Sequence, residues 1–172
     1  MKIIVSPAKT MIENTDGYIG SSIPTYIDYS ETLLKEIRKK TYEELKEIWK
    51  CNEKIADENF ERFKNMNLQG SLTPAIFSYQ GIQYQYMAVN VMEAVAIEYI
   101  RENLYILSGF FGILRAFDGV SPYRLEMQAK FCVGEYKNLY EFWGDKIYKK
   151  LFEKDDVVIN LASKEYSKTV EN

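Results

Sequence analysis

The sequence predicts an α/β fold in which helices surround a mixed β-sheet. Short apolar runs rich in β-branched residues alternate with longer segments whose apolar residues recur at helical spacing. Of the 172 residues, 47% are hydrophobic and 15% aromatic, which is typical of a packed domain and not of a disordered chain. The length suits one domain, so we expect residues 1–172 to fold as a single α/β unit.

The first half of the chain is expected to contain one strand followed by helices. The run Lys2–Val5 is apolar and stops at Pro7, which favours a strand buried on both faces. Thr41 and Glu44 have the spacing of a capping box, and Asn52 can begin the next helix. In chain order, the prediction is a strand at 2–5, a polar loop at 13–24, and helices that begin near 26, 43 and 52.

The second half alternates predicted strands and helices. Ala75-Ile-Phe-Ser-Tyr reads as a strand that Gly81 ends, and Asp156-Val-Val-Ile-Asn-Leu has the pattern of a buried strand. Ser163 can cap the short helix that follows. In chain order, the prediction is a strand at 75–79, a helix at 89–101, strands at 104–107 and 125–133, a helix at 139–152, a strand at 156–161 and a helix at 162–166.

Charge and composition limit the functional classes. The 22 basic and 25 acidic residues give a net charge of −3, which excludes a uniformly basic nucleic-acid coat but permits a local basic groove. The chain has no histidine, so it lacks the usual general base and the commonest zinc ligand, and we expect no metal or cofactor. Cys51 and Cys132 form no CxxC pair. No signal peptide or membrane-length apolar segment is apparent, so a cytoplasmic protein with reduced thiols is expected.

Polar residues that could carry chemistry gather at the predicted ends of strands and helices. Lys9 follows the first strand, where α/β sheets tend to bind ligands, although from spacing alone a solvated lysine in a turn is the simpler interpretation. Arginines near short loops suit phosphate, but they can also pair with neighbouring carboxylates and only hold loops in place. The candidates are Arg115, Asp118, Tyr123, Arg124 and Glu126, then Asp145, and finally Asn160, Ser163, Glu165 and Tyr166.

The segment Gly109-Phe-Phe-Gly112 suggests a phosphate contact of a different kind. Two glycines three residues apart between apolar segments resemble the hairpin of helix-hairpin-helix DNA-binding proteins. In such hairpins the backbone N–H groups contact phosphate without reading sequence. Two glycines at this spacing are also common by chance.

Four segments together are similar to the YaaA family of bacterial peroxide stress proteins. They are Ser6-Pro-Ala-Lys-Thr10, Leu107–Arg115 continuing to Pro122–Met127, Leu139–Asp145, and Val158–Tyr166. They occur in the family's order and span both ends of the chain. The family continues well beyond the last segment, so we expect a C-terminal part to be missing here, and Ala116 stands where the family often has proline.

The resemblance implies a cytoplasmic α/β protein of the oxidative stress response that keeps unincorporated iron low. It also implies a positively charged cleft, with a helix-hairpin-helix element, that binds double-stranded DNA. Carried over by position, phosphate would meet Lys9, Gly109, Gly112, Arg115, Tyr123 and Arg124, and the cleft would also be lined by Ser6, Asp145, Asn160, Ser163 and Tyr166. The expected partner is duplex DNA or a nucleotide, with no membrane, and a monomer is the expected state.

Two further hypotheses stay open. The cleft could belong to an enzyme that acts on a nucleotide or nucleobase, because its carboxylates exceed what phosphate binding needs. Asp118, Glu126 and Glu165 are then the catalytic candidates, and burial would have to raise the pKa of a carboxylate that serves as general base. Direct iron binding by carboxylates is the other reading, although iron sites usually draw on imidazole or thiolate ligands.

Overall fold

The structure is a computed structural model that describes residues 1–13, 19–70, 72–154 and 157–171. Its centre is a mixed four-stranded sheet in the order β6-β5-β1-β8. The strands are β1 (Lys2–Val5), β5 (Leu104–Ser108), β6 (Gly112–Arg115) and β8 (Val158–Asn160). Strands β5 and β8 run parallel to β1, and β6 runs antiparallel to β5. The predicted mixed α/β architecture is therefore confirmed.

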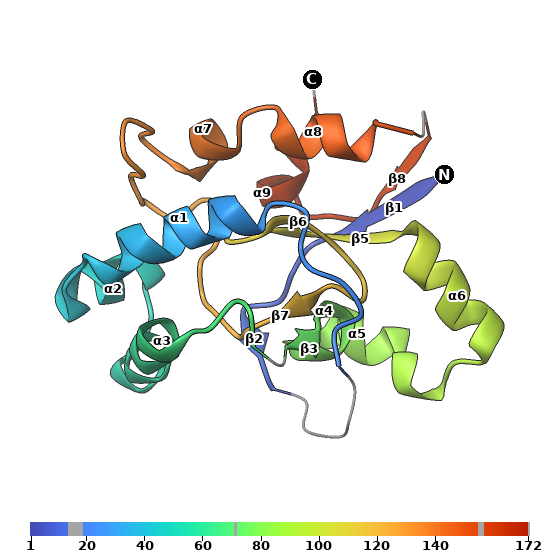
Figure 1. Cartoon of the computed structure of the whole chain (residues 1–172), viewed down its shortest axis with the longest axis horizontal. Helices are drawn as coiled ribbons and strands as arrows, with labels where there is room; N and C mark the ends of the chain where they lie inside the picture. Colours follow the sequence, from blue (N-terminus) through green and yellow to red (C-terminus); the bar gives the residue numbers. More distant parts are fainter. Residues whose placement is uncertain (14–18, 71, 155–156, 172) are drawn as a thin grey trace.

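Helices and small strand pairs surround this sheet (Figure 1). On one side lie α7 (Leu139–Trp143), α8 (Lys146–Leu151) and α9 (Lys164–Ser167). On the other lie the pairs of β2 (Thr10–Met11) with β4 (Tyr79–Gln80) and of β3 (Thr73–Pro74) with β7 (Gly119–Val120), together with α4 (Ala75–Ser78) and α5 (Ile82–Met87). The ends of the molecule in this view are formed by α1 (Ile27–Arg38), α2 (Tyr42–Trp49) and α3 (Glu53–Asn65), and opposite them by the 3-10 helix η1 (Val89–Val91) and α6 (Ala94–Asn103).

The N-terminal predictions hold for the described residues. Strand β1 forms as expected, and Ile4 and Val5 are buried. Thr41 and Glu44 form the predicted capping box of α2, and Asn52 caps α3 through a bond from the Ile55 N–H to its side chain. Of the predicted 13–24 loop, residues 14–18 lie outside the described residues.

The predicted strand at 75–79 is wrong, because residues 75–78 form the helix α4. Only its flanks are extended, and they pair as β3 with β7 and as β4 with β2. The backbone N–H groups of Ala75 and Ile76 donate to the carbonyls of Asp118 and Ala116, which fixes the start of the turn. A short run that is buried on every side carries no periodicity to distinguish a helix from a strand.

The predicted strand at 125–133 is also wrong. From Tyr123 to Phe131 buried residues alternate with more exposed ones, yet no strand pairing joins this segment to the sheet. A turn interrupts the segment at residues 127–128, where the Ala129 N–H donates to the Glu126 carbonyl, and the alternation reflects a chain that lies half-buried on the core. The sequence pattern cannot distinguish such a segment from a hydrogen-bonded strand.

Three other elements differ in detail from prediction. The 139–152 helix is divided into α7 and α8 at Gly144, whose φ of +50° suits glycine. The 89–101 helix is divided into η1 and α6. Strand β8 forms within the 156–161 segment, of which Asp156 lies outside the described residues, but β8 is an edge strand and Ile159 is 40% exposed, so the predicted burial is wrong.

The segment around Gly109 is a β-hairpin and not a helix-hairpin-helix element. Ser108 at the end of β5 pairs with Gly112 at the start of β6. Phe110 and Phe111 at the tip are fully buried, and both of their backbone N–H groups donate to the Ser108 hydroxyl. Gly112 has a φ of +73°, and a Cβ there would lie 2.7 Å from the Trp143 ring. Gly109 and Gly112 therefore serve packing, and the predicted phosphate contact at this hairpin is wrong.

Candidate functional site

The three parallel strands β1, β5 and β8 have their carboxyl ends on the same side of the central sheet. The register pairs Val5 with Ile106 and Ile4 with Asn160, so the loops after β1, β5 and β8 leave the sheet side by side. Open α/β sheets bind ligands outside the carboxyl ends of their strands. The loop after β1 contributes Ser6 and Lys9 to this edge, and the loop after β8 contributes Ser163.

A fourth segment reaches the same edge because Gly109 has no side chain. A Cβ at Gly109 would lie 2.4 Å from the Leu125 carbonyl oxygen and 3.1 Å from the Met127 nitrogen. The segment 123–127 therefore passes directly against the end of β5. Because its residues alternate in burial, Tyr123 and Leu125 face the core while Arg124 and Glu126 are more exposed.

These four segments enclose a crevice of about 160 Å³, which we call the strand-end crevice. Its described lining consists of Ser6, Pro7, Ala8, Lys9, Tyr123, Arg124, Leu125, Glu126, Ser163, Glu165 and Tyr166. Eight of the predicted site residues are in this set, drawn from both ends of the chain. The structure thus brings Ser6, Lys9, Tyr123, Arg124, Ser163, Glu165 and Tyr166, with the catalytic candidate Glu126, into one place.

The charges in the crevice are balanced in number but unevenly satisfied. Glu126 accepts a bond from Arg124 Nη2 at 3.0 Å and pairs with Lys9 Nζ at 3.2 Å, one through each carboxylate oxygen. The Nε of Arg124 is buried and has no hydrogen-bond partner among the residues that the structure describes. A buried donor without a partner carries a desolvation cost, so the Arg124 guanidinium is not fully satisfied by the described residues. With Glu165, the crevice holds two cations and two carboxylates.

Glu165 differs from Glu126 in its environment. Its side chain accepts from the Gln128 N–H at 3.2 Å, while the Tyr140 hydroxyl donates to its backbone carbonyl at 2.8 Å. Burial raises the pKa of the Glu165 carboxyl, and the nearby Glu126 charge adds to the shift, although backbone N–H donors and Lys9 oppose it. Two carboxylates in different environments are a common arrangement for proton transfer.

Direct hydrogen bonds connect the two ends of the chain across the crevice. The Ser163 N–H donates to the Ser6 hydroxyl at 2.8 Å, and that hydroxyl donates to the Ser163 hydroxyl at 3.1 Å. Ser163 does precede α9 as predicted, but its side chain makes no capping bond because it is engaged with Ser6. The crevice floor therefore depends on both terminal segments.

A layer of tyrosines supports the crevice from the core. The Tyr123 hydroxyl shares hydrogen bonds with Ser108 at 2.6 Å and Tyr79 at 2.8 Å, and the Tyr84 hydroxyl donates to the Ser6 carbonyl at 2.8 Å. Burial raises the pKa of Tyr123 to about 12, and it raises the pKa of Tyr166 even further. These phenols stay protonated at neutral pH and act as fixed hydrogen-bonding groups. Sequence reasoning missed Tyr79 and Tyr84, because fourteen tyrosines in the chain make any one of them inconspicuous.

Arg115 and Asp118 lie elsewhere. Arg115 pairs with Tyr105 near the amino end of β5. It therefore lies at the opposite end of the strands from Ser108, which is at the carboxyl end of β5. Asp118 is fully buried and accepts from the Arg115 N–H at 2.9 Å, the Arg115 Nε at 3.0 Å and the Ser22 hydroxyl. For this pair, the interpretation as a structural ion pair accounts for the geometry, and the expectation that it lines the same crevice is wrong.

Asp145 and Asn160 also stay outside the crevice lining. Asp145 is exposed at the junction of α7 and α8 and pairs with Lys149. Asn160 ends β8, and its side chain accepts from the Ala162 N–H at 3.0 Å, which shapes the loop that leads to Ser163. Each is near a chain turn, as the sequence indicated, but neither is in the crevice.

In residues 1–13, 19–70, 72–154 and 157–171, no three or more Asp, Glu, Cys or His side chains are grouped so that they could hold a metal ion. Over the same ranges, each helix is too short or too polar to traverse a lipid bilayer.

Comparison with known proteins gives a consistent result. The sequence profile of the family described as "Peroxide stress protein YaaA" matches residues 1–172. A UPF0246 protein of Lachnoclostridium phytofermentans is 57% identical over 171 residues, which cover 99% of this chain and 67% of that relative. A UPF0246 protein of Agathobacter rectalis is 53% identical over 99% of this chain and 69% of its own length, and one of Desulfitobacterium hafniense is 49% identical over 99% and 68%.

Proposed function

The chain belongs to the YaaA family of peroxide stress proteins, and from that premise we propose that it limits peroxide damage in the cytoplasm by binding phosphate in the strand-end crevice. The ligand class is duplex DNA or a nucleotide. The observation that carries the proposal is Arg124, whose buried Nε has no partner although its Nη2 pairs with Glu126. Lys9, 65% exposed at the mouth of the crevice, supplies a second cation.

The balanced charge of the crevice sets the expected strength of this binding. The two oxygens of Glu126 already pair with Lys9 and Arg124. A phosphate would therefore have to displace the Glu126 carboxylate from these two cations. Binding is therefore expected to be modest at physiological salt, and to depend on salt through about two neutralised phosphates.

Anisotropy titrations of a fluorescent DNA duplex against salt concentration test the proposal. Two phosphate contacts predict a slope of roughly −1.8 in log affinity against log salt. Lys9→Gln and Arg124→Gln should each reduce that slope by about one contact. Lys149→Gln removes an exposed cation that pairs outside the crevice and is the matched control. Equal slopes in all four proteins, or no binding at low salt, would contradict the proposal.

Glu126→Gln provides the complementary test. The amide keeps the size of the side chain but removes the competing negative charge, so phosphate affinity should rise by about tenfold. A titration with a nucleoside monophosphate in place of the duplex distinguishes the two ligand sources. A duplex-only gain would favour DNA, and a gain for both would favour a nucleotide-sized site.

The family's role in peroxide stress includes, in this proposal, a lowering of unincorporated intracellular iron. Glu126 is engaged by Lys9 and Arg124, so we expect the effect on iron to follow from the ligand of the crevice and not from iron held by its carboxylates. Equilibrium dialysis with ferrous iron should then show no stoichiometric binding. In peroxide-stressed cells, chelatable iron should rise when Arg124→Gln replaces the natural chain, and remain unchanged with Lys149→Gln.

An enzyme that acts on a nucleotide or nucleobase is the second candidate. The observation that favours it is the raised pKa of the Glu165 carboxyl beside Glu126. In that case Glu165 would exchange protons with the ligand while Lys9 and Arg124 hold its phosphate. Incubation with nucleotides should reveal turnover. The Glu165→Gln substitution should abolish this turnover but leave nucleotide binding intact. Binding without turnover across the common nucleotides would exclude this candidate and leave the first.

A further inference from the structure

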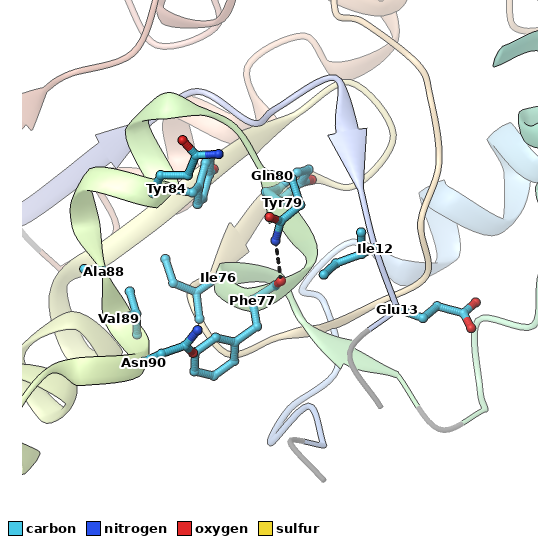
Figure 2. Close-up of a pocket in the computed structure, with 11 residues that line it drawn as sticks. Ile12, Glu13, Ile76, Phe77, Tyr79, Gln80, Tyr84, Ala88, Val89 and Asn90 are labelled. Atoms are coloured by element: carbon cyan, nitrogen blue, oxygen red, sulfur yellow. Dashed lines mark hydrogen bonds between the residues drawn. The ribbon is translucent and has the colours of Figure 1, made fainter. Parts of the chain in front are cut away.

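The structure has a second cavity, of about 470 Å³ (Figure 2). Its walls come from three segments: residues 12–13 after β2, residues 76–80 in α4 and β4, and residues 84–90 in α5 and η1. It shares no lining residue with the crevice. Its volume falls within the range of sites for small molecules and cofactors.

The described lining of the cavity contains no basic side chain. Among its described lining residues the only charged side chain is Glu13, and in Figure 2 the Glu13 carboxylate points away from the other labelled residues. A phosphate or carboxylate placed here would meet no cation and would be repelled by Glu13. The ligand that this cavity suits is uncharged, which separates it in chemistry as well as position from the strand-end crevice.

Carboxamides form the polar part of the lining. Gln80 donates one N–H to the Phe77 carbonyl at 3.2 Å, which orients its amide. The exposed side chains of Gln85 and Asn90 make no hydrogen bond within the described part of the chain. Each carboxamide presents both donors and an acceptor, so three of them can match a ligand edge that alternates donors and acceptors.

The rest of the lining is apolar and partly aromatic. Ile76, Phe77, Tyr84 and Val89 are each less than 10% exposed, so their positions are fixed by packing. The Phe77 ring also makes an edge contact with Phe117 at 6.0 Å. A rigid apolar floor of this kind suits a flat ring that can lie against it, since every heteroaromatic base has an apolar face.

The backbone around the cavity is held in place before any ligand binds. Ile12 donates its N–H to the Ser78 carbonyl at 2.9 Å, and the Ser78 hydroxyl donates to the Ile12 carbonyl at 2.8 Å. On the other wall, Ala88 ends α5 with a φ of +47°, a conformation that a residue with a Cβ rarely adopts. That turn carries Val89 and Asn90 back toward the cavity, and such local strain is often found at binding sites.

We propose that this cavity binds the base of a nucleoside, with the ring against the apolar floor and its edge hydrogen-bonded to Gln80, Gln85 and Asn90. Paired donors and acceptors on Asn and Gln side chains are suited to the edge of adenine. The proposal does not depend on phosphate binding in the crevice, because a nucleoside carries no phosphate. The two sites nevertheless share a wall: Tyr84 lines the cavity while its hydroxyl donates to Ser6, and Tyr79 lines it while its hydroxyl contacts Tyr123.

Calorimetric titration of the full chain with adenosine tests this site. Gln85→Leu and Asn90→Leu remove exposed amides and should leave the fold intact, and each should weaken adenosine binding by about tenfold. Gln69→Leu removes an exposed amide elsewhere and should change the affinity by less than about twofold. Urea unfolding of each variant verifies that a loss of binding is not a loss of structure.

A double variant of the crevice tests whether adenosine binds in the cavity or in the crevice. In the Lys9→Gln, Arg124→Gln double variant, adenosine binding should be unchanged if it occupies the cavity. Adenosine binding that vanishes in this background but survives Gln85→Leu and Asn90→Leu would overturn the proposal. Absence of binding at millimolar adenosine would overturn it as well. Neither result would bear on the phosphate proposal, whose own test uses the duplex and its salt dependence.

Discussion

Two arginine–carboxylate clusters come from one stretch of the chain, and they differ in how fully their charges are satisfied. At the far edge of the sheet, the buried Asp118 carboxylate accepts from the Arg115 backbone, the Arg115 guanidinium and the Ser22 hydroxyl. In the strand-end crevice, the buried Arg124 Nε has no partner within the described part of the chain, and Glu126 pairs with both Arg124 and the exposed Lys9. The first cluster is complete without a ligand, and the second is not.

The comparison shows that residue type and spacing alone do not indicate function. Arg115 and Asp118 are three apart around a tight turn, so they close on each other, and the Asp118 N–H also bonds to the Arg115 carbonyl at 3.1 Å. Arg124 and Glu126 are two apart in a segment whose burial alternates, so both side chains lie on its more exposed face, where they line the crevice. Local backbone geometry thus decides which cluster holds a loop and which can bind.

The largest expected effect is on stability at the satisfied cluster. Asp118→Ala should lower the free energy of unfolding by about 3 kcal/mol, because it leaves the Arg115 N–H and the Ser22 hydroxyl without their shared acceptor in the core. Urea denaturation at neutral pH measures this loss. Glu126→Ala, at the open cluster, is the matched variant and should cost no more than about 1 kcal/mol. Similar losses for both would remove the distinction between the clusters.

A smaller loss is expected where the tyrosine layer supports the crevice. Tyr123→Phe deletes the hydroxyl that joins Ser108 and Tyr79, and should cost about 1 to 2 kcal/mol while the ring packing stays. Tyr148→Phe, in which the ring also packs on a neighbour, serves as the control. If Tyr123→Phe and the control are equally stable in urea, the buried hydroxyl network does not stabilise the crevice floor.

At Arg124 itself the expected change has the opposite sign. Arg124→Met keeps an unbranched side chain. It loses the Nη2 bond to Glu126, which Lys9 still pairs, but it also removes a buried donor that has no partner among the described residues, so stability should stay the same or rise by up to about 1 kcal/mol. DNA binding should fall at the same time. Thermal unfolding and anisotropy on the same preparation check both halves. A destabilised variant would mean that the guanidinium serves the fold, as Arg115 does.

Much of the fold could be predicted from the sequence wherever local chemistry decides the structure. The capping box of Thr41 and Glu44 and the β-branched run at the N-terminus are such cases, and both are confirmed. Failures came where tertiary packing overrides pattern. Residues 75–78 are buried on all sides, and the exposed β8 carries an apolar sequence at a sheet edge. Neither situation leaves a period that sequence can report.

The sequence could predict most residues that line the candidate site, but it could not predict which of the other candidates lie outside it. Lys9, Arg124 and Ser163 do meet at the strand ends, because parallel strands bring their loops to one edge. Arg115 was misplaced because β6 runs antiparallel, which sends its last residue to the opposite edge. The hairpin at Gly109 sets this direction, and its resemblance to a helix-hairpin-helix element predicted no antiparallel strand pair there. One local error therefore misplaced one cluster.

The smallest effect is a pH dependence that separates Glu165 from its neighbour. Burial raises the pKa of this carboxyl above its usual value of 4.5 in the folded chain, so the folded state binds more protons than the unfolded state just above pH 4.5. Stability should consequently decline as pH rises through that window, from about pH 4.5 to the folded pKa, and Glu165 should contribute no pH dependence below it. Glu165→Gln removes the titration, so its stability relative to the natural chain should rise across the window and then level off. Urea unfolding of both proteins at closely spaced pH values measures this difference. A stability difference that does not change with pH would mean that the Gln128 N–H and Lys9 compensate fully for burial. Glu165 would then no longer be a candidate for proton transfer, but the phosphate proposal for Arg124 would be unaffected.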